Sequence, residues 1–189
     1  MGPRNRGCSM ETPVGRLSPA SELERAVALG VRIAVAESLT GGLLADALVA
    51  VPGASRAFSG GIVAYDTELK RSLLGVDAEL LESRGPVDAE VAKQMARGVR
   101  RACATPRVGA AQVVEAEIGL ATTGVAGPDP DPATGQPAGT VWVGVSSALG
   151  ERAVLLRSEG DRPRVRAQTV AAALRELAAE LALLDDQAP

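Results

Sequence analysis

The chain has 189 residues, of which 46% are hydrophobic and 23% are charged, and its formal net charge is −3. These values suit one ordinary globular domain with a sizeable core, and the negative charge argues against a protein whose main task is to hold nucleic acid. No segment is long and apolar enough to span a membrane, no apolar stretch follows the N-terminal arginines as in a secretory signal, and the two cysteines suggest no disulfide framework, so we expect a cytoplasmic protein.

The chain begins with residues 1–17, which are rich in glycine, proline and arginine and which we expect to form a disordered tail. Residues 18–186 are predicted to form a single domain. Its first helix is expected to open with a capping box at Ser21-Glu22-Leu23-Glu24 and to end near Gly30. The further expected elements, in chain order, are a strand over 31–36, a helix over 40–50, a strand over 60–64, short helices over 67–73 and 77–83, a helix from Asp88 to Cys103, strands over 118–122, 140–146 and 153–156, and a helix from Asp161 to Leu184.

Strands that alternate with helices predict an α/β fold, namely a three-layer α/β/α sandwich with a mixed, mostly parallel sheet. The strands over 140–146 and 153–156 are separated by a turn near Gly150, so we expect them to form an antiparallel pair. In such folds, ligands bind beyond the carboxyl ends of the strands. The glycine-rich breaks after Ala36 and Thr122 both lie at such ends, which predicts a site there.

The most informative break is Glu37-Ser38-Leu39-Thr40-Gly41-Gly42, which joins a buried strand to a helix. A sharp turn of this kind presents a hydroxyl together with backbone N–H groups that stabilise an anion, which is what acyl transfer requires. A simple helix N-cap is an equally good explanation for Ser38. A carboxylate at a buried strand end, such as that of Glu37, is expected to have a partner or a ligand.

The chain has no histidine, which excludes Ser–His–Asp and Cys–His catalysis and every histidine-ligated metal. A serine nucleophile therefore needs another base, and lysine can serve once burial lowers its pKa. The only lysines are Lys70, which follows the single tyrosine Tyr65 by five residues, and Lys93, which has the context of a helix surface. We favour Lys70 as the base, with a solvated lysine on a short helix as the alternative.

Two further segments are candidates for ligand contacts. The glycines between Thr123 and Pro128 allow the backbone to approach a ligand closely, although a tight loop explains them equally. Arg162, Arg164 and Arg166 lie in the first turn of the last expected helix, where cations oppose the helix dipole. We interpret this turn as a phosphate clamp made of guanidinium and helix N–H groups, with a solvated basic turn as the alternative.

Five motifs in order resemble one known family. They are Ala-Glu-Ser-x-Thr-Gly-Gly, Tyr-x-x-x-x-Lys, Thr-Gly-Val-Ala-Gly-Pro, Gly-Thr-Val-Trp-Val-Gly and Gly-Asp-Arg-x-x-Val-Arg, and the resemblance covers roughly residues 20–184. They look like the C-terminal domain of CinA proteins, which also occurs alone as nicotinamide-nucleotide amidohydrolase. The resemblance implies hydrolysis of nicotinamide mononucleotide to nicotinate mononucleotide and ammonia, as a step of NAD recycling. It also implies a Ser/Lys mechanism that uses neither a metal nor another cofactor.

The resemblance assigns roles to particular residues. It makes Ser38 the nucleophile and Lys70 the general base, and Tyr65 relays a proton or orients the lysine. The implied substrate-binding residues are Glu37, Thr40, Gly41 and Gly42 around the oxyanion site, Thr123 and Gly124 in the substrate site, and Arg162 and Arg166 at the phosphate. The implied partner is a small-molecule nucleotide, without direct nucleic-acid or membrane contact, and the chain is expected to form a homo-oligomer of two or more copies.

The sequence departs from the family pattern at three places. Gly85-Pro86-Val87-Asp88 stands where Gly-Ala-Val-Ser is more usual, and both Asp and Ser can cap a helix. Leu39 follows the serine where cysteine is usual, at a position expected to face the core. The loop over 128–139 is rich in proline and aspartate and lacks the usual glycine pair after Pro128. This loop keeps open an alternative function, a non-catalytic nucleotide-binding or interaction module linked to competence or DNA damage. A nucleotide phosphotransferase is less favoured, because no Walker-type Gly-Lys-Ser/Thr occurs.

Overall fold

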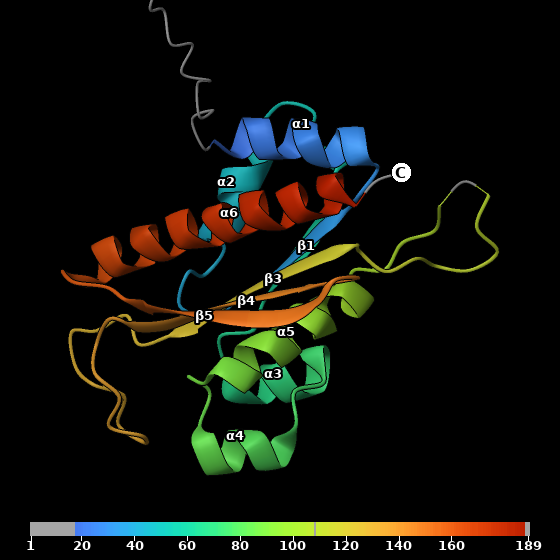
Figure 1. Cartoon of the computed structure of the whole chain (residues 1–189). Helices are drawn as coiled ribbons and strands as arrows, with labels where there is room; N and C mark the ends of the chain where they lie inside the picture. The colour runs from blue at the N-terminus through green and yellow to red at the C-terminus, as the bar shows by residue number, and fades with distance from the viewer. Residues whose placement is uncertain (1–17, 108, 188–189) are drawn as a thin grey trace, which may run out of the picture.

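The computed structural model describes residues 18–107 and 109–187, so the expected tail over 1–17 lies outside the described residues. Figure 1 shows a five-stranded sheet with α1, α2 and α6 on one face and α3, α4 and α5 on the other. The α/β class and the three-layer sandwich are confirmed. The extent of the single domain and the formation of a homo-oligomer stay predictions.

The elements follow the expected order. The helices are α1 (Pro19–Leu29), α2 (Leu43–Val49), α3 (Thr67–Leu74), α4 (Ala78–Arg84), α5 (Ala89–Ala102) and α6 (Arg162–Asp186), with a short 3-10 turn at Ala54–Arg56. The strands are β1 (Ile33–Glu37), β2 (Phe58–Val63), β3 (Ile118–Gly124), β4 (Thr140–Ser147) and β5 (Gly150–Arg157). In the part of the chain that the structure describes, no helix has the length and the apolar character needed to cross a membrane.

The strands are arranged in the order β2-β1-β3-β4-β5. β1 runs parallel to both β2 and β3, and β4 runs antiparallel to both β3 and β5. Four strands therefore point in one direction and β4 alone points in the other, which confirms a mixed, mostly parallel sheet. The expected antiparallel pair is β4 and β5. In the middle of the sheet, Glu37 at the end of β1 lies opposite Thr122 of β3.

β1 is buried on both faces, because alternate residues point into the two cores. Ile33 and Val35 pack with α1, α2 and α6, whereas Ala34 and Ala36 pack with α5. Small residues let α5 come very close to the sheet. A Cβ at Gly144 of β4 would lie only 2.1 Å from the carbonyl oxygen of Ala92 in α5. The carboxyl ends of β1 and β3 are thereby held in a rigid central position.

Two helix starts differ from expectation. The capping box of α1 is made by Ser18 and Ser21, one turn earlier than the expected Ser21–Glu24 pair, and Pro19 occupies the first turn. α2 begins at Leu43, whereas a start at residue 40 was expected. The residues before Leu43 form a separate turn, and this turn carries the candidate site.

Candidate active site

The turn after β1 is fixed by the carboxylate of Glu37. This side chain is 1% exposed, and its two oxygens accept the backbone N–H groups of Gly42, Leu44 and Ala45 at 3.0, 3.0 and 2.8 Å. A strand residue thus caps the helix that follows it, and the negative charge lies at the positive end of the helix. Glu37 therefore shapes the turn and does not line the cavity described below.

The same turn brings the two glycine-rich breaks together. The N–H of Ser38 donates to the carbonyl oxygen of Thr122 at 3.0 Å, and the hydroxyls of Thr40 and Thr122 form a buried hydrogen bond of 2.7 Å. Gly41 and Gly42 have φ angles of 57° and 98°, which favour glycine. The result is a stiff corner that holds the Ser38 hydroxyl beside the end of β3.

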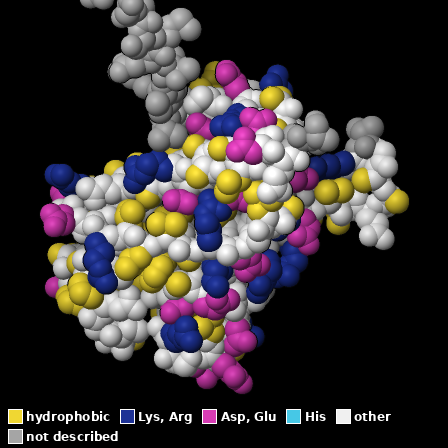
Figure 2. Space-filling view, in the orientation of Figure 1, with side chains coloured by type: hydrophobic (Ala, Val, Ile, Leu, Met, Phe, Trp, Pro, Cys, Tyr) yellow, Lys and Arg dark blue, Asp and Glu magenta, His cyan; other side chains and the backbone are white. Residues whose placement is uncertain are grey.

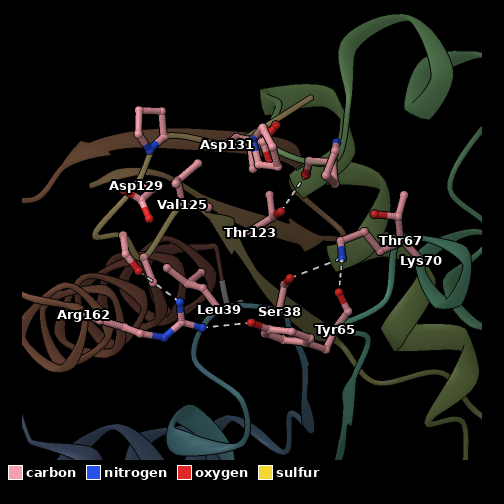
Figure 3. A pocket seen from close by; sticks show the side chains of 17 residues that line it. Ser38, Leu39, Tyr65, Thr67, Lys70, Thr123, Val125, Asp129, Asp131 and Arg162 are labelled. Atoms are coloured by element: carbon pink, nitrogen blue, oxygen red, sulfur yellow. Dashed lines mark hydrogen bonds between the residues drawn. The ribbon is translucent and has the colours of Figure 1, made fainter. Parts of the chain in front are cut away.

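Lys70 of α3 reaches this corner from a distant part of the sequence. Its side chain is 1% exposed, and its Nζ lies 3.2 Å from Ser38 Oγ, 2.8 Å from the Ala64 carbonyl oxygen and 3.4 Å from the Tyr65 carbonyl oxygen (Figure 3). The two carbonyls can only accept hydrogen bonds. A neutral amine that donates to both of them directs its lone pair at the Ser38 hydroxyl, which is the orientation a general base needs.

The electrostatic surroundings favour that neutral form. Burial lowers the pKa of Lys70 from 10.5 to about 8, and the nearby charge of Asp66 opposes this decrease only in part. Lys93 of α5 offers a contrast, because its side chain is 30% exposed and forms an ion pair with Glu90. Of the two lysines, Lys70 is the one that contacts the serine and has a base-like pKa.

Tyr65 contacts the lysine through its backbone and not through its phenol. Its side chain is 59% exposed, and its hydroxyl accepts a hydrogen bond of 2.8 Å from Nη2 of Arg162. The residue contacts Lys70 through its carbonyl oxygen, so it orients the lysine by its backbone. The phenol makes no hydrogen bond to Ser38 or Lys70 within the described residues, and its contact with Arg162 explains why: the ring turns toward the start of α6 (Figure 3).

A cavity of about 330 Å³ opens over this centre. It is lined by Ser38, Leu39, Tyr65, Lys70, Thr123, Gly124 and Arg162, among the residues that the sequence singled out, and by Pro86, Val87 and a loop over 129–132, among others. The volume suits a small molecule. Pro86 and Val87 were not predicted as site residues, because they enter the cavity only through tertiary packing, where Thr123 Oγ1 donates to the Pro86 carbonyl oxygen at 2.6 Å.

The donors for an oxyanion also differ from expectation. The N–H groups of Gly41 and Gly42 already bond to the Ser38 carbonyl and to Glu37, so these glycines form the turn and are not free donors. Within residues 18–107 and 109–187, no acceptor contacts the N–H of Leu39 or Thr40. These two amides flank Ser38 on the helix side and are the available donors for developing negative charge.

The three arginines of the first turn of α6 diverge. Arg162 lines the cavity and donates to the Gly127 carbonyl oxygen at 3.1 Å as well as to Tyr65. Arg166 donates to the carbonyl oxygens of Leu39 and Thr40 at 2.9 and 2.8 Å, so it stabilises the serine turn and does not line the cavity. Arg164 lines a different groove. The expected clamp of several arginines on one phosphate is therefore reduced to Arg162.

The described residues hold no group of three histidine, cysteine, aspartate or glutamate side chains that could bind a metal ion. The site offers a serine hydroxyl, a lysine base and the two backbone N–H groups of Leu39 and Thr40, which have no acceptor among the described residues. Such a set can attack a carboxylic acid derivative and stabilise the resulting oxyanion.

Comparisons with known proteins agree on one group of relatives. A family model described as the CinA C-terminal domain matches residues 19–181. A CinA-like protein of Frankia casuarinae is 50% identical over 142 residues, which are 75% of this chain and 30% of the relative. A putative competence-damage inducible protein of Desulforudis audaxviator is 42% identical over 146 residues, which are 77% of this chain and 32% of the relative. The chain thus spans about a third of the length of these curated relatives.

Solved structures show the same fold. A competence-damaged protein (CinA) superfamily protein from Klebsiella pneumoniae superposes with a TM-score of 0.75 at 33% identity, covering 87% of this chain and 96% of that one. A competence/damage inducible protein from Agrobacterium tumefaciens gives a TM-score of 0.72 at 32% identity, covering 85% and 94%. The arrangement of strands and helices that holds the serine and the lysine is therefore a shared one.

Proposed function

This chain belongs to the CinA C-terminal domain family, and from this premise we propose that it hydrolyses the carboxamide of nicotinamide mononucleotide. The products are nicotinate mononucleotide and ammonia. The single observation that carries the proposal is the distance of 3.2 Å between Lys70 Nζ and Ser38 Oγ at the base of a cavity. The choice of this nucleotide rests on the resemblance of the motifs.

The first half of the reaction forms an acyl-enzyme. Lys70 removes the proton of the Ser38 hydroxyl as Oγ attacks the carboxamide carbon, and the carbonyl electrons move onto oxygen. The N–H groups of Leu39 and Thr40 stabilise this oxyanion. The C–N bond then breaks, the leaving nitrogen takes the proton from the lysine ammonium, and ammonia departs from an ester on Ser38.

The second half returns the enzyme to its starting state. Lys70 removes a proton from water, the hydroxide attacks the ester carbon, and the Ser38 oxygen leaves and regains its proton from the ammonium. The carbonyl oxygens of Ala64 and Tyr65 hold Nζ in one place through both halves, which supports its use as base twice. Arg162, the one arginine among the described residues that lines the cavity, binds the substrate phosphate by exchanging its Tyr65 contact for phosphate oxygens.

Ammonia release from nicotinamide mononucleotide by the purified protein tests the proposal. We expect turnover by the wild type and a loss of about a thousandfold or more in kcat for Ser38→Ala. Calorimetry with the same nucleotide separates the alternative function, since binding without ammonia release supports a non-catalytic nucleotide-binding module. If the protein neither binds nor hydrolyses this nucleotide, both assignments are wrong.

A further inference from the structure

A second concave surface lies between the end of β5 and the outer side of α6. This groove of about 430 Å³ is lined by Arg157, Ser158, Glu159, Arg164, Gln168 and Arg175, among others. None of these residues lines the cavity over Ser38. Figure 2 presents the face of the molecule formed by α6 and β5, over which lysine and arginine side chains lie at several places.

The helix period directs Arg164 into this groove. Arg164, Gln168 and Arg175 are four and seven positions apart along α6, so they share one side of the helix. Arg162 is two positions from Arg164, which places the two arginines about 200° apart around the axis. A Cβ at Gly160 would lie 2.6 Å from Cδ of Arg164, so the glycine leaves room for the Arg164 stem beside the backbone.

The positive charges that line the groove are not balanced by neighbouring carboxylates of the described residues. In the described part of the chain, the guanidinium groups of Arg157, Arg164 and Arg175 form no salt bridge or hydrogen bond, and Glu159 is the only acidic residue of the lining. The adjacent Arg152, by contrast, is held by carboxylates of α6. All three side chains are exposed, so their guanidinium groups are open to an anion that enters the groove from solvent.

Two polar atoms of the same lining also lack partners. Ser158 Oγ and Gln168 Oε1 are buried, and neither forms a hydrogen bond to another described residue. An unsatisfied buried polar atom costs about 1–3 kcal/mol. The Ser158 hydroxyl can donate to an acceptor in the groove, whereas Gln168 donates there only if its amide is turned so that the NH2 group takes the place of Oε1.

We propose that this groove binds a small anion that carries two or more linked phosphate groups. Guanidinium groups and phosphate oxygens pair in a bidentate manner, which favours phosphate over other anions. The backbones of Arg164 and Arg175 are about 16 Å apart along the helix axis, so both guanidinium groups contact one anion only when their long side chains extend toward each other, and a second phosphate group shortens the reach that each needs. Among the described residues, no aromatic side chain lines the groove, so recognition rests on the phosphates rather than on a stacked base.

Titration calorimetry on the full chain tests this site with inorganic phosphate, inorganic pyrophosphate and adenosine diphosphate. We expect pyrophosphate to bind with one-to-one stoichiometry and to bind at least about tenfold more tightly than single phosphate. The double variant Arg164→Gln/Arg175→Gln is expected to lose at least about tenfold in pyrophosphate affinity, whereas Arg162→Gln, on the opposite side of the same helical turn, keeps the wild-type affinity. Circular dichroism confirms that each variant is folded.

The outcomes separate the groove from the cavity over Ser38. A loss of binding in Arg162→Gln with retention in the double variant would place the anion in the cavity and overturn the proposal. Absence of saturable binding, or equal affinity for single phosphate and pyrophosphate, would also overturn it. Similar affinities for pyrophosphate and adenosine diphosphate support recognition of the phosphates alone. Tighter binding of adenosine diphosphate would identify a nucleoside diphosphate as the ligand. None of these results depends on whether nicotinamide mononucleotide is hydrolysed.

Discussion

Lys70 and Lys93 are the only lysines of the chain, and they lie in opposite surroundings. Lys70 is buried against Ser38 and two backbone carbonyls, without a carboxylate in hydrogen-bond contact among the described residues. Lys93 lies on the surface of α5 in an ion pair with Glu90. The comparison teaches that burial without a paired counter-charge, and not the residue type, makes an amine available as a base at moderate pH.

Replacing each lysine by methionine tests this comparison most directly. Lys70→Met removes the base and the hydrogen bond to Ser38, so we expect kcat for ammonia release to fall by about a thousandfold or more. Lys93→Met removes only a surface ion pair, and its kcat is expected to stay within about twofold of the wild type. Steady-state assays at pH 8 measure both. Equal effects of the two substitutions would break the comparison.

The second test is the stability of the same pair of variants as a function of pH. The pKa of Lys70 is about 8 in the folded chain, against 10.5 for an unperturbed lysine, so between these values the unfolded chain binds more protons. The free energy of unfolding should therefore rise by about 3 kcal/mol from pH 8 to pH 10.5 relative to Lys70→Met, with the penalty fully present below pH 8. Urea unfolding at three pH values measures it.

Comparison with Lys93→Met provides the control for this pH series, because the other titrating groups are the same in both variants. The wild type and Lys93→Met should follow parallel curves. If the difference between the wild type and Lys70→Met stayed constant from pH 8 to pH 10.5, the lowered pKa of Lys70 would be refuted.

Glu37 extends the comparison to carboxylates. Glu37→Gln replaces one of the two oxygens that accept three backbone N–H groups, so we expect a loss of about 2 kcal/mol in the free energy of unfolding. The matched control is Glu90→Gln, which removes the exposed partner of Lys93 and should cost less than about 0.5 kcal/mol. Urea denaturation at pH 7 measures both, and similar losses would show that the cap at Glu37 is unimportant.

The fold and the two central residues were predictable because their signals are local or compositional. The apolar run of β1 and the small polar residues after it indicate a strand that breaks into a helix. The absence of histidine and the scarcity of lysine narrow the base to two residues, of which Lys70 contacts Ser38.

The remaining contacts of the site depend on tertiary structure, which periodicity does not encode. Glu37 was expected to meet a ligand or a partner, and the partners are N–H groups of its own turn. Tyr65 approaches the lysine through its carbonyl and not through its phenol, a distinction that residue type cannot reveal. The divergence of Arg162, Arg164 and Arg166 follows from helical geometry once the start of α6 is known, because residues two apart face different sides.

The smallest expected effect concerns the one charge that moderates Lys70. The carboxylate of Asp66 raises the pKa of Lys70 against the larger effect of burial, and it also caps α3 by accepting the N–H of Glu68 at 2.8 Å. Asp66→Asn keeps an acceptor for the cap but removes the charge. The limb on which kcat/KM increases with pH should therefore move to lower pH by a fraction of a unit.

A pH profile from 6 to 9 measures this shift. Asp77→Asn, the equivalent change at the cap of α4, is the control and should leave the limb in place. A shift to higher pH would mean that Asp66 does not stabilise the ammonium form, and Lys70 would then differ from Lys93 by burial alone.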